Sequence, residues 1–337
     1  MSLPSVKNVL RLPRTQLTSL ELCAGGGGQA LGLEDAGFKH IGLVELDRHA
    51  VATLRHNRPE WNVIPADLKT FDARAFDGRV DLLAGGLPCP PWSRAGKQHG
   101  EDDERNLWPA ALRIVGEVKP KAVMFENVRG ILDAVFEDFR TRFASAPELA
   151  GYTTGWKLLN ACDFGVPQLR PRVVFVAIRN ENAHGWSWPD PAATSPATVG
   201  EALHDMMREN GWRGARKWLR IANEIAPTIV GGSLKHGGPD LGPTRARREW
   251  ASLGVDGLGI ANEPPGRDFV GMPRLTVQMV AKLQGFPPEW EFQGGKTASY
   301  RQIGNAFPPP VAAAVAKRIR DCLLAVGSAA RVEGVAL

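Results

Sequence analysis

The chain has 337 residues, of which 43% are hydrophobic and 23% are charged, so it can build a large core and wholesale disorder is disfavoured. The formal net charge of +5 suits a polyanionic partner such as nucleic acid. Four widely separated cysteines without a Cys-x-x-Cys pair argue against a zinc site or a disulfide framework. The chain has no apolar run approaching the roughly 18 residues of a membrane span, so we expect a cytoplasmic protein without a membrane partner.

Short apolar runs alternate with amphipathic stretches in the first half of the chain. This alternation predicts an α/β fold with a mainly parallel sheet and right-handed crossovers. The first strand is expected at residues 20–23, and a glycine-rich turn then leads into a helix with Gly37 as its C-terminal cap. Further strands are expected at residues 41–46, 80–84, 122–125 and 173–178.

The composition changes after about residue 180. Proline, glycine, tryptophan and arginine become frequent and the periodicity weakens, which indicates a smaller second lobe with long loops. Near the C-terminus, Val311, Val315, Ile319 and Leu323 share one face of a helix, which should pack back on the first lobe. We therefore expect a first domain at residues 1–180, a second at 181–272, and a return through the hinge to the first domain over 273–337.

The glycine-rich turn at residues 24–28 has the features of a nucleotide-like cofactor site. Glycines permit a sharp turn and close approach of a ligand, and the following helix presents unpaired backbone amides. Glu45 ends the next expected strand, where a carboxylate can accept hydrogen bonds from ribose hydroxyls, and Asp67 could contact an adenine amino group. A purely structural tight turn is the alternative. Because Gly-x-Gly-x-x-Gly is incomplete and Lys-Ser or Lys-Thr is missing, a P-loop is disfavoured.

Cys89 lies in a proline-rich loop that follows an expected strand. It should therefore sit at the carboxyl edge of the sheet, where open α/β sheets bind ligands. The flanking prolines restrict the backbone and would hold the sulfur in place, and the polar stretch at residues 94–105 could move as a lid. An isolated cysteine is more often a core residue, but a proline-rich loop makes a poor core.

The order of Pro88-Cys89, Glu126-Asn127-Val128 and Gln168-Leu169-Arg170-Pro171-Arg172 resembles the C5-cytosine-specific DNA methyltransferases of bacterial restriction-modification systems. Residues 274–287 and 300–307 are similar to the last two motifs of that family, so the resemblance runs from about residue 20 to 316. It implies a Rossmann-like fold dependent on S-adenosyl-L-methionine, with a smaller target-recognition domain. It also implies double-stranded DNA as partner.

The resemblance implies roles for five catalytic residues. Cys89 would add to C6 of cytosine, since C5 is a poor nucleophile until that addition makes it electron-rich. Glu126 would contact N3 and the exocyclic amine, and Asn127 would orient the surrounding loop. Arg170 and Arg172 would supply the positive charge that lowers the pKa of the thiol. The target nucleotide must be flipped out of the duplex.

The remaining expected contacts fall into two sets. Residues expected at the cofactor are Cys23, Gly25, Gly27, Gly28, Glu45, Leu46, Asp67, Leu68, Pro88 and Asn305. Cys23 departs from the family pattern, which often has phenylalanine against the adenine there. Residues expected at DNA are Ser93, Arg94, Gly231, Gly232, Lys235, Arg245 and Arg247. No metal is expected.

Three other functions remain open at this stage. An RNA cytosine methyltransferase of the same fold would have a much shorter recognition lobe than the stretch between Arg172 and Arg274 allows. A catalytically inactive DNA-binding homologue is disfavoured by the intact catalytic set. A nicotinamide oxidoreductase would leave the cysteine loop unexplained. We expect the protein to be a monomer. If it belongs to a restriction-modification system, its partner would be a cognate restriction endonuclease acting on the same DNA site.

Overall fold

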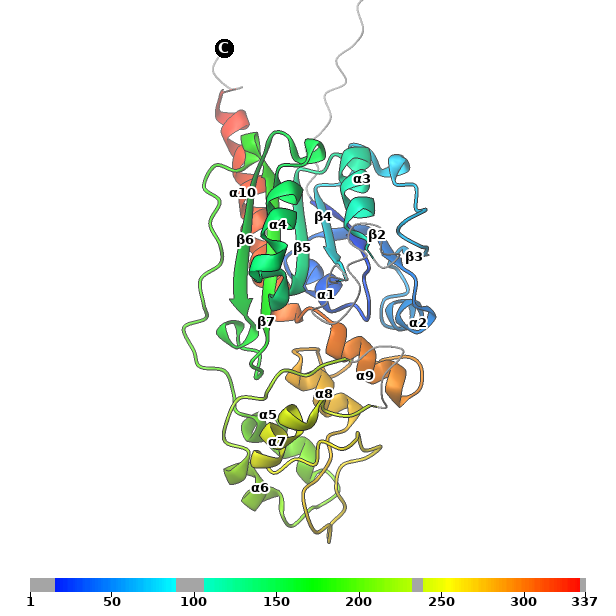
Figure 1. The fold of residues 1–337 in the computed structure, drawn as a ribbon, viewed down its shortest axis with the longest axis vertical. Coiled ribbons are helices and arrows are strands. Elements are labelled where there is room, and N and C mark those ends of the chain that lie inside the picture. Colours follow the sequence, from blue (N-terminus) through cyan, green and yellow to red (C-terminus); the bar gives the residue numbers. More distant parts are fainter. Residues whose placement is uncertain (1–15, 89–105, 232–238, 334–337) are drawn as a thin grey trace, which may run out of the picture.

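The computed structural model describes residues 16–88, 106–231 and 239–333 of the chain. A sheet covered by helices forms one lobe, and a helical second lobe lies below it in Figure 1. Within the described ranges, no helix has the length and apolar character to cross a membrane.

The first lobe is built on a mixed sheet that has seven strands within the described residues, in the order β3-β2-β1-β4-β5-β7-β6. The strands are β1 (Thr18–Leu22), β2 (Lys39–Glu45), β3 (Val63–Pro65), β4 (Leu82–Gly86), β5 (Ala122–Val128), β6 (Tyr152–Asn160) and β7 (Pro171–Arg179). The first five run parallel, whereas β7 pairs antiparallel with both β5 and β6. The strand order reverses between β1 and β4, which makes their carboxyl ends the crevice where such sheets bind ligands.

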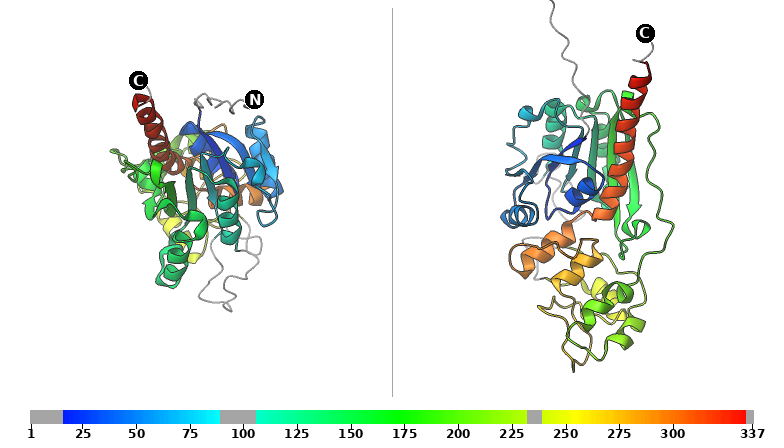
Figure 2. Two further views of the ribbon diagram at one scale, coloured as in Figure 1. Left: turned by 90° about the horizontal axis from the view of Figure 1, so that it is seen from above. Right: turned by 180° about the vertical axis from the view of Figure 1, so that it is seen from behind.

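Helices cover both faces of the sheet. On one face, α3 (Trp108–Val118) and α4 (Glu137–Ala144) pack on alternate strand residues such as Leu83 and Phe125. On the other, α1 (Gly28–Asp35) and α10 (Pro309–Glu333) lie side by side, as the view from behind in Figure 2 shows. The predicted apolar face of the last helix is buried there against Leu33 and Phe38, so its return to the first lobe is confirmed.

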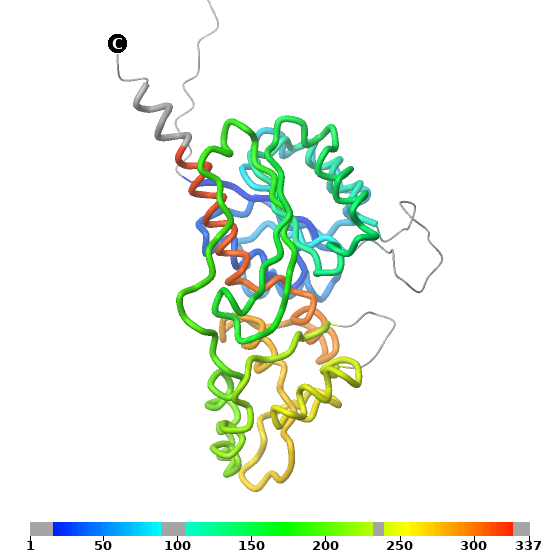
Figure 3. Tube along the Cα trace, turned by 60° about the vertical axis from the view of Figure 1, so that its left-hand side comes forward, coloured from blue at the N-terminus to red at the C-terminus, as the bar shows by residue number. Residues whose placement is uncertain are grey.

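The second lobe is mostly helical. It contains α5 (Val199–Arg208), α6 (Ala215–Ile221) and α7 (Thr244–Ser252), and the chain returns through α8 (Val277–Leu283) and α9 (Lys296–Asn305). Trp212, Trp218 and Trp250 fill its core. The same apolar cluster continues through α8 and α9 to α2 (Arg48–Asn57) in the first lobe, so the two lobes share packed side chains. The Cα trace in Figure 3 shows the second lobe, in yellow and orange, directly below the first.

The sequence correctly indicated the mainly parallel sheet but not its edges. The pattern did not reveal β3 or β6, because β3 has three residues and β6 is a half-exposed edge strand. Gly37 has a φ of 88° just after α1, as its predicted role as a helix cap requires.

Candidate active site

Two cavities meet at the carboxyl end of the sheet. The first, of about 240 Å³, lies over the glycine-rich turn, and the second, of about 610 Å³, lies between the ends of β4 and β5 and the segment 228–231. Gly86, Glu126 and Asn305 line both. The first cavity is also lined by Glu21, Cys23, Ala24, Gly25, Gly26, Gly28, Gln29, Glu45, Asp47, Ala50, Arg301, Gln302, Ala306 and Phe307. The two cavities therefore adjoin at these three shared residues.

The glycine-rich turn is held by Glu45 at the end of β2. Its carboxylate accepts hydrogen bonds from the backbone N–H groups of Gly25 at 2.7 Å, Leu46 at 2.8 Å and Asp47 at 2.7 Å. Gly25 has a φ of 55°, in the left-handed region that favours glycine. Burial raises the pKa of Glu45, although the three N–H groups oppose the shift. The carboxylate lines the cavity and keeps a lone pair on Oε2 for a ligand.

Gly27 and Leu46 are among the residues predicted at the cofactor that do not line the first cavity. A Cβ atom on Gly27 would lie 2.7 Å from the indole of Trp290, whose N–H donates to the Gly26 carbonyl at 3.0 Å. A Cβ on Gly28 would lie 2.4 Å from the Phe307 carbonyl oxygen, although Gly28 does reach the cavity. These glycines thus allow two remote segments to close on the turn. Leu46 is 67% exposed and outside the cavity.

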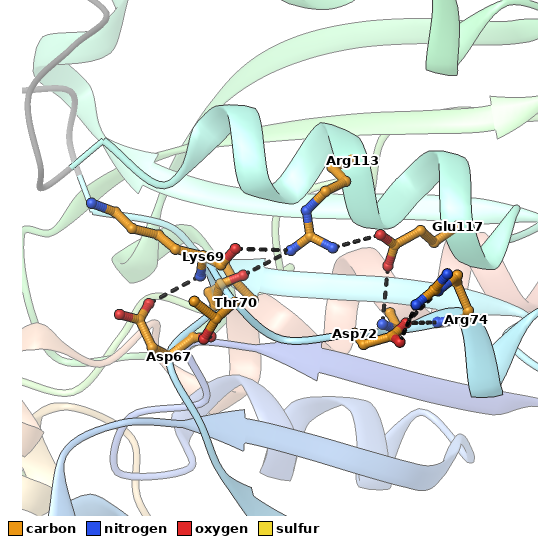
Figure 4. Close-up of polar contacts among 9 residues, drawn as sticks. Asp67, Lys69, Thr70, Asp72, Arg74, Arg113 and Glu117 are labelled. Carbon is orange, nitrogen blue, oxygen red and sulfur yellow. Dashed lines mark hydrogen bonds and ion pairs between the residues drawn. The ribbon is translucent and has the colours of Figure 1, made fainter.

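Asp67 and Leu68 lie on a loop after β3 and do not line the first cavity. Helix α3 holds this loop (Figure 4). Arg113 donates to the Leu68 carbonyl at 3.0 Å and pairs with Glu117 at 2.5 Å, and Glu117 accepts from the Ala73 N–H at 2.9 Å. The loop is therefore fixed, with the exposed Asp67 side chain accepting only the Lys69 N–H at 2.9 Å among the contacts the structure describes.

Glu126 and Arg172 form a buried ion pair in the second cavity. Nε of Arg172 lies 2.8 Å from Oε1 of Glu126, and each side chain is 9% exposed. Burial raises the pKa of Glu126, and the charges of Arg172 and Arg170 oppose this shift only in part. A Cβ on Gly86 would lie 3.5 Å from Oε2 of Glu126, so this carboxyl faces the strand that leads to Cys89. Glu126 is therefore an acid that keeps its proton to higher pH than an ordinary glutamic acid side chain.

Two side chains hold the stem of the cysteine loop. Nδ2 of Asn127 donates to the Leu87 carbonyl at 2.8 Å, and its Oδ1 accepts the Val128 N–H at 2.9 Å. The indole of Trp108 donates to the Pro88 carbonyl at 3.2 Å. The backbone entering the cysteine loop is therefore fixed from β5 and from α3. Cys89 itself, with Ser93, Arg94, Gly232 and Lys235, lies outside the described residues.

Arg170 is not placed in either cavity. It is fully buried, and its terminal nitrogens donate to the carbonyls of Ile229 at 2.6 Å, Gly304 at 2.6 Å and Ala306 at 3.0 Å. The structure thus brings together Glu126, Asn127 and Arg172 from the predicted catalytic set, while Arg170 contacts main chain at the junction of the lobes. The sequence motif alone could not separate the two arginines.

None of the three cysteines that the structure describes is an activated thiol. Burial is the largest cause that raises the pKa of Cys23, Cys162 and Cys322, and neighbouring carboxylates raise the pKa of each thiol further. A raised pKa keeps a thiol protonated and unreactive. Cys23 nevertheless lines the first cavity, as predicted for a cofactor contact.

The predicted DNA residues that the structure describes have different environments. Arg245 is exposed on α7 and pairs with Glu249 at 3.1 Å. The side chain of Arg247 packs against Gly257, since a Cβ placed there would lie 3.1 Å from its Cγ. Gly231 is buried in the wall of the second cavity. Only Arg245 has the free exposure of a phosphate contact.

Sequence comparison decides the family. Residues 17–321 match the model of the C-5 cytosine-specific DNA methylases. The chain belongs to the C-5 cytosine-specific DNA methylase family. It is 53% identical over 313 residues to the Type II methyltransferase M.NgoMIV of Neisseria gonorrhoeae, covering 91% of this chain and 98% of that protein. It is 54% identical to M.NaeI of Lentzea aerocolonigenes, covering 91% of this chain and 75% of that protein.

Solved structures share the fold. A prophage-encoded methyltransferase from E. coli superposes with a TM-score of 0.65 at 24% identity, covering 91% of this chain and 99% of that one. Spodoptera frugiperda DNMT2 gives 0.61 at 18% identity, covering 91% and 99%. Membership of the family makes the chain a DNA (cytosine-5-)-methyltransferase that uses S-adenosyl-L-methionine. The predicted Rossmann-like fold is confirmed.

The first cavity suits this cofactor chemically. Both carboxyl oxygens of Glu21 and both polar side-chain atoms of Gln29 are buried there without a hydrogen-bond partner within the described part of the chain. Such atoms cost free energy unless a ligand or water satisfies them. An amino acid portion carrying an ammonium group would do so, while Glu45 would hold the ribose. The sequence prediction missed Glu21 and Gln29, and only their burial in the structure identifies them.

Proposed function

We propose that the second cavity receives a cytosine flipped out of duplex DNA and that Cys89 attacks its C6 atom. The observation that supports this is that Glu126, the acid of the second cavity, also lines the first. A cofactor in the first cavity would supply an electrophilic methyl group to a base in the second. The reacting atoms would thus meet beside Glu126 and Gly86.

The chain's own residues account for the other steps. The Cys89 thiolate forms a bond to C6, the electron pair of the C5–C6 double bond shifts to the C4–C5 bond, and the C4–N3 pair moves onto N3, to which Glu126 donates a proton. The electron-rich C5 then takes the methyl group. Removal of the C5 proton by a base restores the C5–C6 double bond as the C6–S bond breaks and the thiolate leaves, and the N3 proton returns to Glu126. Arg172 holds Glu126 in place at 2.8 Å throughout.

The second lobe is proposed to read the target sequence, with the division of the chain at about residues 180 and 272. The Arg245 side chain is exposed and pairs with Glu249 on the surface, so it can exchange that partner for a DNA phosphate. Arg94, Ser93, Lys235 and Gly232 are proposed to contact DNA around the flipped base. Arg247 and Gly231 are proposed to shape the lobe instead. We further propose a cytoplasmic monomer that protects a site cut by a cognate restriction endonuclease.

The recognition site can be found by expressing the chain in a methylation-free bacterium and sequencing a resident plasmid after bisulfite treatment. We expect one cytosine within a single short duplex sequence to resist bisulfite conversion almost completely, because a dedicated lobe reads base edges. The Glu126→Ala variant, expressed equally, is the control. Protection of transfer RNA but not of plasmid DNA would contradict the proposal.

Glu21 is proposed to bind the amino group of the cofactor's methionine portion. The native enzyme should bind S-adenosylhomocysteine more tightly than its analogue lacking that amino group, and Glu21→Gln should reduce this preference about tenfold, because a charge-assisted hydrogen bond is lost. Calorimetry of both ligands measures this. The decarboxylated analogue is the control, since native and variant should weaken equally with it. An unchanged preference would place the amino group elsewhere.

A further inference from the structure

A buried polar network joins the segment before β7 to both cavities. Arg170 donates to the carbonyls of Gly304 and Ala306, the residues on either side of Asn305. Its other terminal nitrogen donates to the carbonyl of Ile229 in the wall of the second cavity. One guanidinium therefore fixes the main chain at Asn305 and the wall of the second cavity together.

Glutamine side chains complete the network. Oε1 of Gln168 accepts the Ile229 N–H at 2.9 Å, and its Nε2 donates to the Leu283 carbonyl at 3.0 Å and to Oε1 of Gln284 at 2.8 Å. Nε2 of Gln284 donates to the Ala306 carbonyl at 2.7 Å. Both glutamines are fully buried. The ends of α8 and α9 are thus tied to the same point as Ile229.

The two segments held by this network touch main chain to main chain. A Cβ on Gly231 would lie 2.3 Å from Oδ1 of Asn305, and a Cβ on Gly304 would lie 2.3 Å from Cα of Gly231. Neither glycine has a positive φ, so close approach alone requires them. The wall of the second cavity therefore rests on the residue that lines the first.

We propose that Arg170 is a positioning residue that keeps the second cavity in register with the first by setting Asn305 and the segment 228–231 against each other. The inference rests on the proposed assignment of the two cavities to cofactor and target base. A planar guanidinium with several fixed donors suits this task, since it reaches carbonyls on two segments at once. A lysine ammonium is a single point and cannot span them.

A substitution in the second cavity should therefore weaken binding in the first. Gly231→Ala should lower the affinity for S-adenosylhomocysteine, without DNA, about tenfold, because its methyl group displaces Asn305. Gly130→Ala is the matched control, since Gly130 lines the same cavity but a Cβ there meets nothing within 4 Å. Its affinity for the same ligand should equal that of the native enzyme. Calorimetry gives both values.

Substitutions of the two arginines in the motif, Arg170 and Arg172, should have different effects on ligand affinity in the same assay. Arg170→Lys should weaken S-adenosylhomocysteine binding about tenfold, whereas Arg172→Lys should leave it unchanged and lower turnover instead. Melting temperatures are measured in parallel, and where Arg170→Lys does not fold, Gly231→Ala decides. Folded Gly231→Ala and Arg170→Lys enzymes with native affinity for the ligand would overturn the proposal.

Failure of the underlying assignment has its own signature. Glu45 lines the first cavity, and its carboxylate holds the glycine-rich turn. Glu45→Gln should therefore also weaken S-adenosylhomocysteine binding. If Glu45→Gln bound the ligand as tightly as the native enzyme, the first cavity would not be the cofactor site, and the positioning role proposed for Arg170 would lose its basis. Weak binding by Glu45→Gln combined with native binding by Gly231→Ala would overturn the positioning role alone.

Discussion

Replacing Cys89 with alanine should abolish methyl transfer, by at least about 10³-fold in kcat, because the variant lacks the thiolate whose bond to C6 makes C5 nucleophilic. Binding of S-adenosylhomocysteine should persist, since seventeen described residues line the first cavity and remain in the variant. The measurement is incorporation of a labelled methyl group into duplex DNA, with cofactor affinity determined on the same preparation.

A cytosine analogue with fluorine at C5 tests the covalent step directly. This carbon cannot lose a proton after methylation, so the C6–S bond cannot break and the enzyme should remain attached to the DNA on a denaturing gel. Cys162→Ala is the matched control, because Cys162 lines neither cavity and its thiol has a raised pKa. It should trap DNA like the native enzyme. Turnover or trapping by Cys89→Ala would refute the mechanism.

The order of elements in the first lobe could be predicted because the signals are local. Apolar runs indicate β1, β2, β4 and β5, and the glycine-rich turn clearly marks the end of β1. The four-residue spacing of valines and isoleucine likewise marks the buried face of α10. The edge strand β6 carries no such signal, since only Leu159 of its residues is buried.

The candidate site was predicted less evenly. Glu126, Asn127 and Arg172 follow directly from the motifs and lie together, since the ends of β5 and β7 are paired in the sheet. The motif also contains Arg170, yet burial and three carbonyl partners give it a different environment. Residues two apart in a strand share one face, but Arg170 precedes β7, which begins at Pro171, so strand alternation does not predict the environment of its side chain.

Other contacts depend on segments distant in sequence. Trp290 covers the glycine-rich turn through a hydrogen bond to Gly26, across most of the chain. Gly27 therefore has a packing role that its place in a cofactor motif does not reveal. Glu21 and Gln29 stand out only because their polar atoms are buried without partners in the described structure. Such features are set by tertiary packing and have no periodic signal.

Glu126→Gln should lower kcat by about 10²- to 10⁴-fold, the usual contribution of a positioned general acid. Gln keeps the shape of the side chain but cannot give a proton to N3. The neutral carboxyl is the donating form, and its population falls as the pH rises through its pKa. Because burial raises that pKa, the native enzyme should keep its donor to higher pH than a free carboxyl would and then lose activity on the alkaline side.

The alkaline loss of activity should belong to Glu126 alone. In a pH profile of kcat, Glu126→Gln should lack this alkaline loss. Glu291→Gln is the control, since that carboxyl is 69% exposed and lines neither cavity. Its profile should overlie the native one. A Glu126→Gln enzyme that still loses activity over the same alkaline range would show that another group gives up its proton there, and Glu126 would then orient the base without protonating it.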